Sequence, residues 1–287
     1  MAEYKDCFFT NTDGLKQHYR DYNTAGDDAP VVLCMPGLTR NPKDFSDIAD
    51  HLADRCRIIA IANRGRGKSD YDPDPSRYKP VTYVADVMEL LGQLGISSVV
   101  AIGTSLGGLM TILIQALHPG TLKAAVINDI GPEVDPSGIA RIKSYVGKGT
   151  PPESWAEAVE GVKRANAGVY PDFTEEDWRW YTHNLYEDVG GKPVMQYDPA
   201  ISQNFESADD QSAPDLWPFF TAMHSIPTVV LRGELSDILS APTLKRMANE
   251  HPDLVPVTVP NLGHVPLMRE PECKAAIDTL IARVSQG

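Results

Sequence analysis

Ile102-Gly103-Thr104-Ser105-Leu106-Gly107-Gly108 is the stretch of sequence that decides the fold. It follows a short apolar run at 98–102 that is rich in β-branched residues and predicts a buried strand. It precedes an apolar run at 109–117 that is long enough for a helix. A strand that passes into a helix through so few residues needs a very tight turn, and glycines keep Cβ atoms out of its crowded corner. The turn therefore projects the Ser105 hydroxyl above the edge of a sheet.

Two interpretations of this stretch remain open at this point. The G-x-S-x-G pattern predicts a nucleophilic serine, and the Leu106 amide would then face the negative charge that develops during the reaction, at the positive end of the following helix. In the alternative, the stretch is a glycine-rich turn whose serine caps the helix, because serine is a favoured N-cap residue. The rest of the chain must decide between them.

Size and composition narrow the class of protein. The chain has 287 residues, 42% of them hydrophobic and 23% charged, which is typical of a soluble globular protein with one large domain or a domain carrying an insertion. Its formal net charge of −13 argues against a nucleic acid or an anionic membrane as partner, since both bind basic surfaces. The acidic residues are scattered, which favours a role in solubility over attraction of a cationic ligand.

No pattern in the sequence points to a metal or a cofactor. The four cysteines form no CxxC pair, and the histidines form no HxxxH or HExxH pattern. Residues 1–6 lack the apolar core of a signal peptide, and no stretch has the length of a membrane span. We therefore expect a reduced, cytoplasmic protein without metal or cofactor; its oligomeric state stays open, with a homodimer as the candidate.

Apolar strands alternate with amphipathic helices in the first and last parts of the chain. This alternation predicts an α/β fold with a mostly parallel, twisted sheet that helices cover on both faces. A hairpin around Asp13-Gly14 within residues 4–22 is expected to come first. The expected strands are 31–35, 57–62, 98–102, 123–127, 227–231 and 254–259, and the expected helices are 44–55, 81–94, 109–117, 242–249 and 271–284.

The alternation stops in the middle of the chain. Residues 132–223 show no clear buried strand, contain all four tryptophans and carry short helical patterns at 153–165 and 175–185. An insertion of this size between two core strands predicts a helical cap over the sheet edge where open α/β sheets bind ligands. We therefore expect a core domain of 1–131 and 224–287 with a cap of 132–223. The tryptophans are expected to form the core of the cap and partly to line a pocket.

Two further residues complete a possible catalytic constellation. A serine hydroxyl is a weak nucleophile unless a base removes its proton and a third group orients that base. Asp237 follows the strand that ends at Leu231, and His264 follows the strand that ends at Val259, so both lie at the same sheet edge as Ser105. Either residue alone would be an ordinary loop residue. The order Ser, Asp, His at three strand ends predicts a triad.

These motifs resemble the α/β-hydrolase superfamily over nearly the whole chain, and the chain is similar to its capped esterase and carbon–carbon hydrolase branch. The resemblance implies that Ser105 is the nucleophile, that His264 acts as base and then as acid, and that Asp237 orients His264. It also implies that the backbone amides of Leu38 and Leu106 form the oxyanion hole. The motifs that carry it are Gly103-Thr104-Ser105-Leu106-Gly107, Arg64-Gly65-Arg66-Gly67-Lys68-Ser69, Gly233-Glu234-Leu235-Ser236-Asp237 and Gly263-His264.

The sequence departs from the superfamily pattern at two places. Pro36-Gly37-Leu38 stands where relatives usually carry His-Gly, which keeps the Leu38 amide and removes the hydrogen bonds of that histidine. Asn63 stands where relatives commonly place aspartate before Arg-Gly. We interpret 63–69 as a structural turn rather than a phosphate-binding loop, because no Gly-Lys-Ser/Thr loop directly follows a strand there.

A second carboxylate competes with Asp237. Asp129 also ends a core strand, and some members of the superfamily use that position. Asp237 matches the superfamily motif better, so we expect Asp237 to be the acid of the triad and Asp129 to bond the base of the cap. The candidate substrate-binding residues are Gly37, Arg40, Trp178 and Trp180.

The expected function is a cofactor-independent serine hydrolase that cleaves a small carboxylic ester or lactone through an acyl-enzyme. A first alternative is hydrolysis of a carbon–carbon bond in a dienoate ring-cleavage product. Such a substrate carries a carboxylate and needs a cationic anchor, for which Arg40 and Arg179 are candidates. A second alternative, of another class, is a ligand receptor with slow or absent turnover; the complete triad argues against it.

Overall fold

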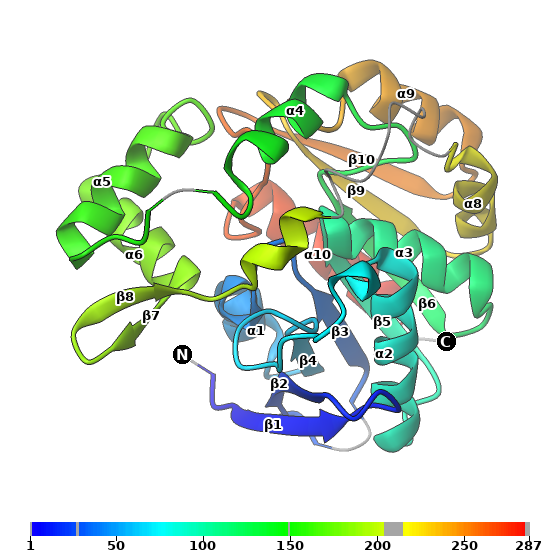
Figure 1. The fold of residues 1–287 in the computed structure, drawn as a ribbon. Helices are drawn as coiled ribbons and strands as arrows, with labels where there is room; N and C mark the ends of the chain where they lie inside the picture. The colour runs from blue at the N-terminus through cyan, green and yellow to red at the C-terminus, as the bar shows by residue number, and fades with distance from the viewer. Residues whose placement is uncertain (1, 27–28, 149, 204–214, 285–287) are drawn as a thin grey trace.

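Eight strands form one sheet at the centre of the molecule, in the order β1-β2-β4-β3-β5-β6-β9-β10 (Figure 1). The computed structural model describes residues 2–26, 29–148, 150–203 and 215–284. β1 and β2 are antiparallel, β2 pairs antiparallel with β4, and the remaining neighbours are parallel. The strands are β1 (Lys5–Thr10), β2 (Lys16–Tyr22), β3 (Val31–Met35), β4 (Arg57–Ile61), β5 (Val99–Thr104), β6 (Leu122–Asn128), β9 (Thr228–Gly233) and β10 (Leu254–Val259).

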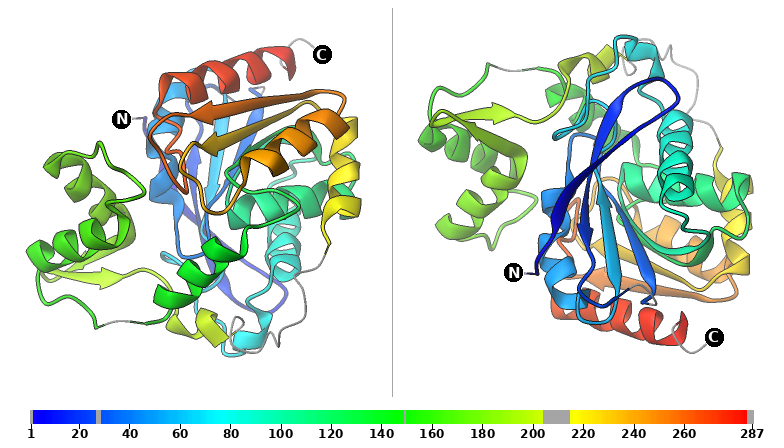
Figure 2. Two further views of the ribbon diagram at one scale, coloured as in Figure 1. Left: turned by 90° about the horizontal axis from the view of Figure 1, so that it is seen from above. Right: turned by 90° about the horizontal axis from the view of Figure 1, so that it is seen from below.

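Helices cover both faces of this sheet (Figure 2). Successive side chains of a strand point to opposite faces, so Ala101 of β5 packs toward α2, α3 and α9 while Val100 and Ile102 pack toward α1 and α10. Burial on both faces explains why these strands are continuous apolar runs, and the predicted α/β architecture is confirmed. The helices are α1 (Ser46–Leu52), α2 (Pro80–Gln93), α3 (Leu106–Leu117), α9 (Ala241–Glu250) and α10 (Pro271–Val284).

The insertion between β6 and β9 has two parts with different surroundings. α5, α6, β7 and β8 project together as a lobe beside the sheet, and α4 lies between this lobe and α9 (Figures 1 and 2). α8, at the other end of the insertion, packs on α3, and its Phe220 is buried in the core beneath it. The elements are α4 (Pro136–Tyr145), α5 (Trp155–Asn166), α6 (Glu175–Leu185), β7 (Tyr186–Val189), β8 (Lys192–Met195) and α8 (Trp217–Thr221), with short 3₁₀ helices η1 (Pro42–Phe45), η2 (Pro75–Arg77), η3 (Pro199–Ser202) and η4 (Ala222–Ser225).

The β7–β8 hairpin is a feature that the periodicity did not predict. Most of its side chains are exposed, so it lacks the apolar run that reveals a buried strand. The lobe helices, in contrast, begin at capping residues that can be recognised in the sequence. Ser154 accepts a hydrogen bond from the Glu157 amide at the start of α5, and Thr174 and Asp177 form a capping box at the start of α6.

The lobe is fastened to the loop that carries His264. The Gly263 amide donates a hydrogen bond to the Val169 carbonyl at 2.7 Å, and the Tyr170 hydroxyl donates to the Val265 carbonyl at 3.0 Å. Arg269 donates to Asp177 of α6 at 2.7 Å. The lobe and the His264 loop therefore hold each other in place.

No helix in the described ranges is both long and apolar enough to cross a membrane.

The turn between β5 and α3 depends on glycine at two positions. A Cβ added to Gly107 would lie 2.0 Å from the Met35 carbonyl oxygen of β3, and one added to Gly103 would lie 2.2 Å from the Gly107 carbonyl oxygen. Both distances are far below van der Waals contact with backbone atoms that cannot move alone. The first turn of α3 therefore sits directly against β3 and β5.

Gly107→Ala is expected to lower the thermal unfolding midpoint by several degrees or to abolish soluble expression, because the new methyl group overlaps the β3 backbone. Gly92→Ala in α2 is the matched control, since a Cβ there meets no atom within 4 Å. This control should gain about 0.5–1 kcal/mol of stability from the reduced entropy of the unfolded chain. Thermal unfolding followed by circular dichroism measures both; equal midpoints for the two variants would contradict the close packing at Gly107.

Candidate active site

Ser105 occupies the sharp turn between β5 and α3. Its backbone has φ 52° and ψ −112°, in the positive-φ region that side chains other than glycine rarely adopt. Its amide donates a hydrogen bond to the Asn128 carbonyl of the neighbouring strand β6. Its hydroxyl oxygen lies 2.9 Å from His264 Nε2. Strain of this kind at a tight strand-to-helix turn is typical of an exposed nucleophile.

His264 links Ser105 to a buried carboxylate. Its Nδ1 lies 2.8 Å from Asp129 Oδ2, and Asp129 is fully buried at the end of β6. The Gly233 amide and the Ser236 hydroxyl donate to the same carboxylate at 3.0 and 2.7 Å. With Nδ1–H donating to Asp129, Nε2 is free to accept the Ser105 proton. Asp129, His264 and Ser105 thus form a continuous hydrogen-bonded chain.

The prediction that Asp237 orients His264 is wrong for this structure. Both oxygens of the Asp237 carboxylate accept hydrogen bonds from Arg141 of α4, at 2.5 and 2.8 Å. Burial by itself would raise the pKa of Asp237, but the hydrogen bonds and charge of Arg141 outweigh it and leave this pKa below its usual value. The physical reason is position: Asp129 directly follows β6, the neighbour of the strand β5 that Ser105 directly follows, whereas Asp237 lies four residues beyond the end of β9.

Leu38 and Leu106, whose backbone amides are the expected oxyanion hole, line a cavity that Ser105 also lines. A Cβ added to Gly37, next to Leu38 in its loop, would lie 3.8 Å from the Ser105 Cβ. A residue that the sequence analysis missed supports this loop. Arg66 is completely buried, and its Nε donates to the Leu38 carbonyl at 2.8 Å while its Nη1 donates to the Arg64 carbonyl at 2.7 Å.

Arg66 belongs to segment 63–69, for which the sequence predicts a structural turn. Its neighbour Arg64 is also buried and donates to Asp86 and Asp72 at 2.6–2.8 Å. These contacts use both arginines within the protein. Arg66 therefore gives the Pro36-Gly37-Leu38 loop, which lacks the histidine, one hydrogen bond at the Leu38 carbonyl. The only signal in the sequence was the Arg-Gly-Arg-Gly motif itself.

Ser105 lies between two cavities of different character. A cavity of about 440 Å³ extends under the lobe and contains charged residues, among them Arg40, Arg141 and Lys148. A second cavity of about 400 Å³ extends between α3 and the start of the insertion, and most of its lining is aliphatic. Leu38, Ser105 and Ile142 line both. A bound substrate can therefore extend from Ser105 in two directions.

The candidate substrate-binding residues separate into two groups. Gly37, Arg40 and Trp180 line the 440 Å³ cavity, as predicted. Trp178 does not: it is 3% exposed and packs with Tyr170 and Phe173 in the lobe's own core, which corrects its assignment to the pocket. Trp178 and Trp180 are two positions apart on α6 and so point in different directions.

The two arginines of the larger cavity are held in similar ways. Arg40 donates from Nε and Nη2 to Asp44 at 2.6 and 2.5 Å, and its guanidinium lies 4.6 Å from the centre of the Tyr181 ring. Burial raises the pKa of Tyr145, and the charges of Arg141 and Arg40 oppose that rise. The positive charges of Arg40 and Arg141 therefore both act on the Tyr145 hydroxyl, which lines the same cavity.

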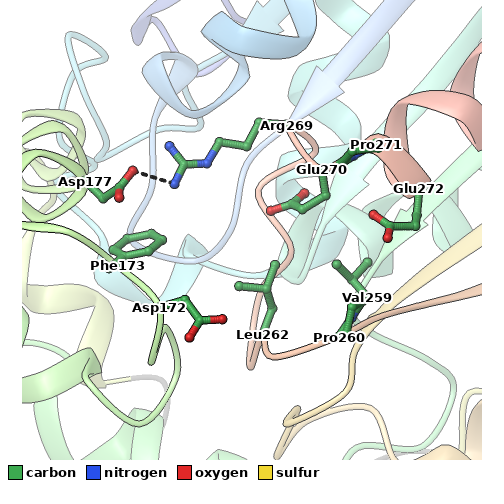
Figure 3. A pocket seen from close by; sticks show the side chains of 10 residues that line it. All are labelled: Asp172, Phe173, Asp177, Val259, Pro260, Leu262, Arg269, Glu270, Pro271 and Glu272. Carbon is green, nitrogen blue, oxygen red and sulfur yellow. Dashed lines mark hydrogen bonds and ion pairs between the residues drawn. The ribbon is translucent and has the colours of Figure 1, made fainter.

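A third cavity, of about 230 Å³, lies where the lobe meets the start of α10. Figure 3 shows Glu270 and Glu272 on one side of it and Asp172 and Asp177 on the other, with Arg269 reaching across to Asp177. None of the three residues of the hydrogen-bonded chain lines it. Across the described ranges, no group of three or more His, Cys, Asp or Glu residues could hold a metal ion.

Comparison with known proteins finds hydrolases among those similar to this chain. The chain is 29% identical over 264 residues to a 3-hydroxybutyrate-oligomer hydrolase of Cupriavidus necator, with 88% of this chain and 89% of the relative covered. It is 27% identical over 236 residues to a 2-(acetamidomethylene)succinate hydrolase of Mesorhizobium japonicum, with 82% and 81% covered. The crystal structure of an alpha/beta hydrolase from Novosphingobium aromaticivorans is 46% identical and superposes with a TM-score of 0.92 over 99% of both chains.

The model of the alpha/beta hydrolase family matches residues 31–274, which contain Ser105, Asp129 and His264. Its span includes every parallel strand of the sheet and the whole insertion. This protein is a member of the alpha/beta hydrolase family and a hydrolase.

Proposed function

We propose that this protein is a serine hydrolase that cleaves a carboxylic ester or lactone of a small molecule through an acyl-enzyme on Ser105, without a cofactor. The observation that carries the proposal is the hydrogen-bonded chain from Asp129 through His264 to Ser105, with Ser105 open to two cavities. A serine, a base and a buried orienting carboxylate in this geometry are the requirements for nucleophilic catalysis.

The first half of the reaction forms the acyl-enzyme. Ser105 Oγ attacks the ester carbonyl carbon while His264 Nε2 takes the hydroxyl proton, and Asp129 stabilises the resulting imidazolium through Nδ1–H. The carbonyl oxygen becomes an oxyanion, which the amides of Leu38 and Leu106 receive. The tetrahedral intermediate then collapses, and His264 gives its proton to the departing alcohol oxygen.

The second half releases the acid. A water molecule gives a proton to His264 and attacks the acyl carbon, and the same two amides hold the second oxyanion. Collapse of this intermediate breaks the bond to Ser105 Oγ, which recovers the proton from His264. The enzyme returns to its starting state with one water consumed.

One observation favours an ester over other bonds, and a second indicates the kind of group beside the cleaved bond. Hydroxy acids join through ester bonds, so the similarity to a 3-hydroxybutyrate-oligomer hydrolase supports an ester substrate for this chain. The aliphatic cavity, lined by residues such as Ile130, Ile139 and Ile238, suits an aliphatic group on one side of the cleaved bond.

Carbon–carbon bond hydrolysis remains the second candidate, because Arg40 lines the cavity at Ser105 and could anchor the carboxylate of a dienoate. Arg179, the other anchor considered, is exposed on α6 and does not line that cavity. A receptor without turnover is disfavoured, since binding alone does not require the Asp129–His264–Ser105 chain.

Ser105→Ala and His264→Ala are each expected to lower kcat for p-nitrophenyl butanoate on the order of a thousand-fold or more, because they remove the nucleophile or its base. Steady-state kinetics on variants with wild-type circular dichroism spectra measure this. Retention of most activity in folded Ser105→Ala would contradict the acyl-enzyme mechanism.

Asp129→Asn is expected to lower kcat at least a hundred-fold more than Asp237→Asn, because Asp129, and not Asp237, is hydrogen-bonded to His264. The two substitutions are chemically identical, so each is the matched control of the other. The reverse order of losses would return the orienting role to Asp237.

Val134→Phe is expected to shift the preference toward shorter chains, either among p-nitrophenyl esters that differ in the acyl chain or among butanoate esters that differ in the alkyl chain, because Val134 lines the aliphatic cavity. Each excluded CH₂ group forfeits about 0.8 kcal/mol, so the ratio of kcat/KM for eight-carbon to four-carbon chains should fall at least about tenfold. Leu117→Phe, at the exposed end of α3, is the control. An unchanged ratio in Val134→Phe would show that substrate does not enter this cavity.

A further inference from the structure

We propose that Arg40 and Arg141 form a carboxylate-binding site in the larger cavity, so that the preferred substrate is an ester that carries a free carboxylate. The inference rests on the proposed ester hydrolysis and adds the charge of the substrate. It also gives Asp237 a role as the positioning residue of Arg141.

The two arginines present the same arrangement of donors. Arg40 donates to Asp44, and Arg141 donates to Asp237, in both cases from Nε and Nη2. A guanidinium has five N–H donors in a rigid plane, and a carboxylate bound along the Nε–Nη2 edge uses two of them. Among the described residues, no hydrogen bond uses Nη1 of either arginine, so the edge formed by Nη1 and Nη2 is left for another acceptor. That edge matches the two oxygens of a second carboxylate.

The available edge of Arg40 is buried. Its Nη1 lies out of contact with solvent and has no hydrogen-bond partner among the described residues. A buried donor without a partner loses its bonds to water, and of the residues with such an atom in the described ranges, Arg40 is the one that lines the larger cavity. Arg40 lines the same cavity as Ser105, so a substrate oxygen is the partner that this geometry lacks.

The aspartates fix the direction of each guanidinium. An unpaired arginine side chain would lose much rotamer freedom on binding a ligand, and a pre-formed ion pair removes part of that cost. Asp237 also lies against α4, which carries Arg141: a Cβ added to Gly138 would lie 2.3 Å from the Asp237 carbonyl oxygen. The loop after β9 therefore sets the position of both the helix and its arginine.

Because the whole chain is negatively charged, binding of an anionic substrate requires positively charged residues close to Ser105. At a net charge of −13 the molecule does not attract anions generally. Arg40 and Arg141 are each balanced by one aspartate, and Lys148 adds a positive charge to the lining of the same cavity. The cavity thus suits one carboxylate bound by directed hydrogen bonds, while the aliphatic cavity on the other side of Ser105 suits the uncharged part of the ester.

The test compares substrates that differ only in charge. One pair is 3-(butanoyloxy)butanoate and its methyl ester, with butanoate release as the readout, and the other is monomethyl glutarate and dimethyl glutarate. The two pairs place the carboxylate on the alcohol side or on the acyl side of the cleaved bond. Wild type is expected to favour the acidic member at least tenfold in kcat/KM in one pair. Equal or greater kcat/KM for the neutral member in both pairs would overturn the inference.

Variants then assign the preference to the arginines. Arg141→Met and Asp237→Asn should each lower the acidic-to-neutral ratio of kcat/KM at least tenfold, mainly through KM for the acidic member, and Asp237→Glu should recover part of the loss. Arg141→Met leaves the Asp237 carboxylate without its partner, and the double variant Arg141→Met/Asp237→Asn removes that carboxylate as well. The double variant should show the same low acidic-to-neutral ratio as Arg141→Met. Arg179→Met, which removes an exposed arginine of α6, is the matched control and should keep the wild-type ratio. A general loss of activity with an unchanged ratio would mean a structural role only and would overturn the inference.

A binding experiment separates this inference from the proposed function. Ser105→Ala lacks the nucleophile, so isothermal titration calorimetry can measure its affinity for the acidic and the neutral member of both substrate pairs directly. At least tenfold tighter binding of the acid in Ser105→Ala, and loss of this difference in Ser105→Ala/Arg141→Met, would support the carboxylate site. If wild type then hydrolyses none of the esters, only the proposed ester hydrolysis fails. Hydrolysis without any difference in binding would overturn the carboxylate site alone.

Discussion

The contact between the first turn of α3 and strands β3 and β5 is the constraint on which the rest of the site depends. Gly103 and Gly107 leave no space for a side chain between helix and sheet, so the chain must reverse at Ser105 with a positive φ. That reversal directs the hydroxyl toward His264 and places Ser105 at the positive end of α3, which begins at Leu106. His264 lies at hydrogen-bond distance from the Ser105 hydroxyl, and Asp129 lies at hydrogen-bond distance from His264.

Two carboxylates at neighbouring strand ends have separate tasks because their partners differ. Asp129 is enclosed by the Gly233 amide, the Ser236 hydroxyl and His264, which together satisfy a buried charge. Asp237 lies farther along the loop after β9 and pairs with Arg141 of the insertion. The first arrangement suits the orientation of a base, and the second ties the insertion to the sheet edge.

Buried arginines organise the loops around Ser105. Arg66 donates a hydrogen bond to the Leu38 carbonyl. Arg40, two residues after Leu38, donates to Asp44 and packs against the Tyr181 ring. A guanidinium can bond carbonyls or carboxylates in several directions while it stays in one plane. The loop that follows β3 is thereby held without the histidine that relatives usually carry, and the insertion closes over it.

The sequence by itself determined the alternation of strands and helices, the turn at Ser105 and the place of His264 after the last strand. These follow from local patterns: apolar runs buried on both faces, glycines at a tight turn, and the order of residues at strand ends. Only the tertiary structure decided between Asp129 and Asp237, because both end core strands and a hydrogen bond to His264 depends on contacts between segments more than 100 residues apart. The bond from Arg66 to the Leu38 carbonyl also joins two separate loops and has no signature in either. The surroundings of Trp178 and the exposed β7–β8 hairpin are local, but neither gives a periodic signal that tells a pocket residue from a core residue or marks an exposed strand.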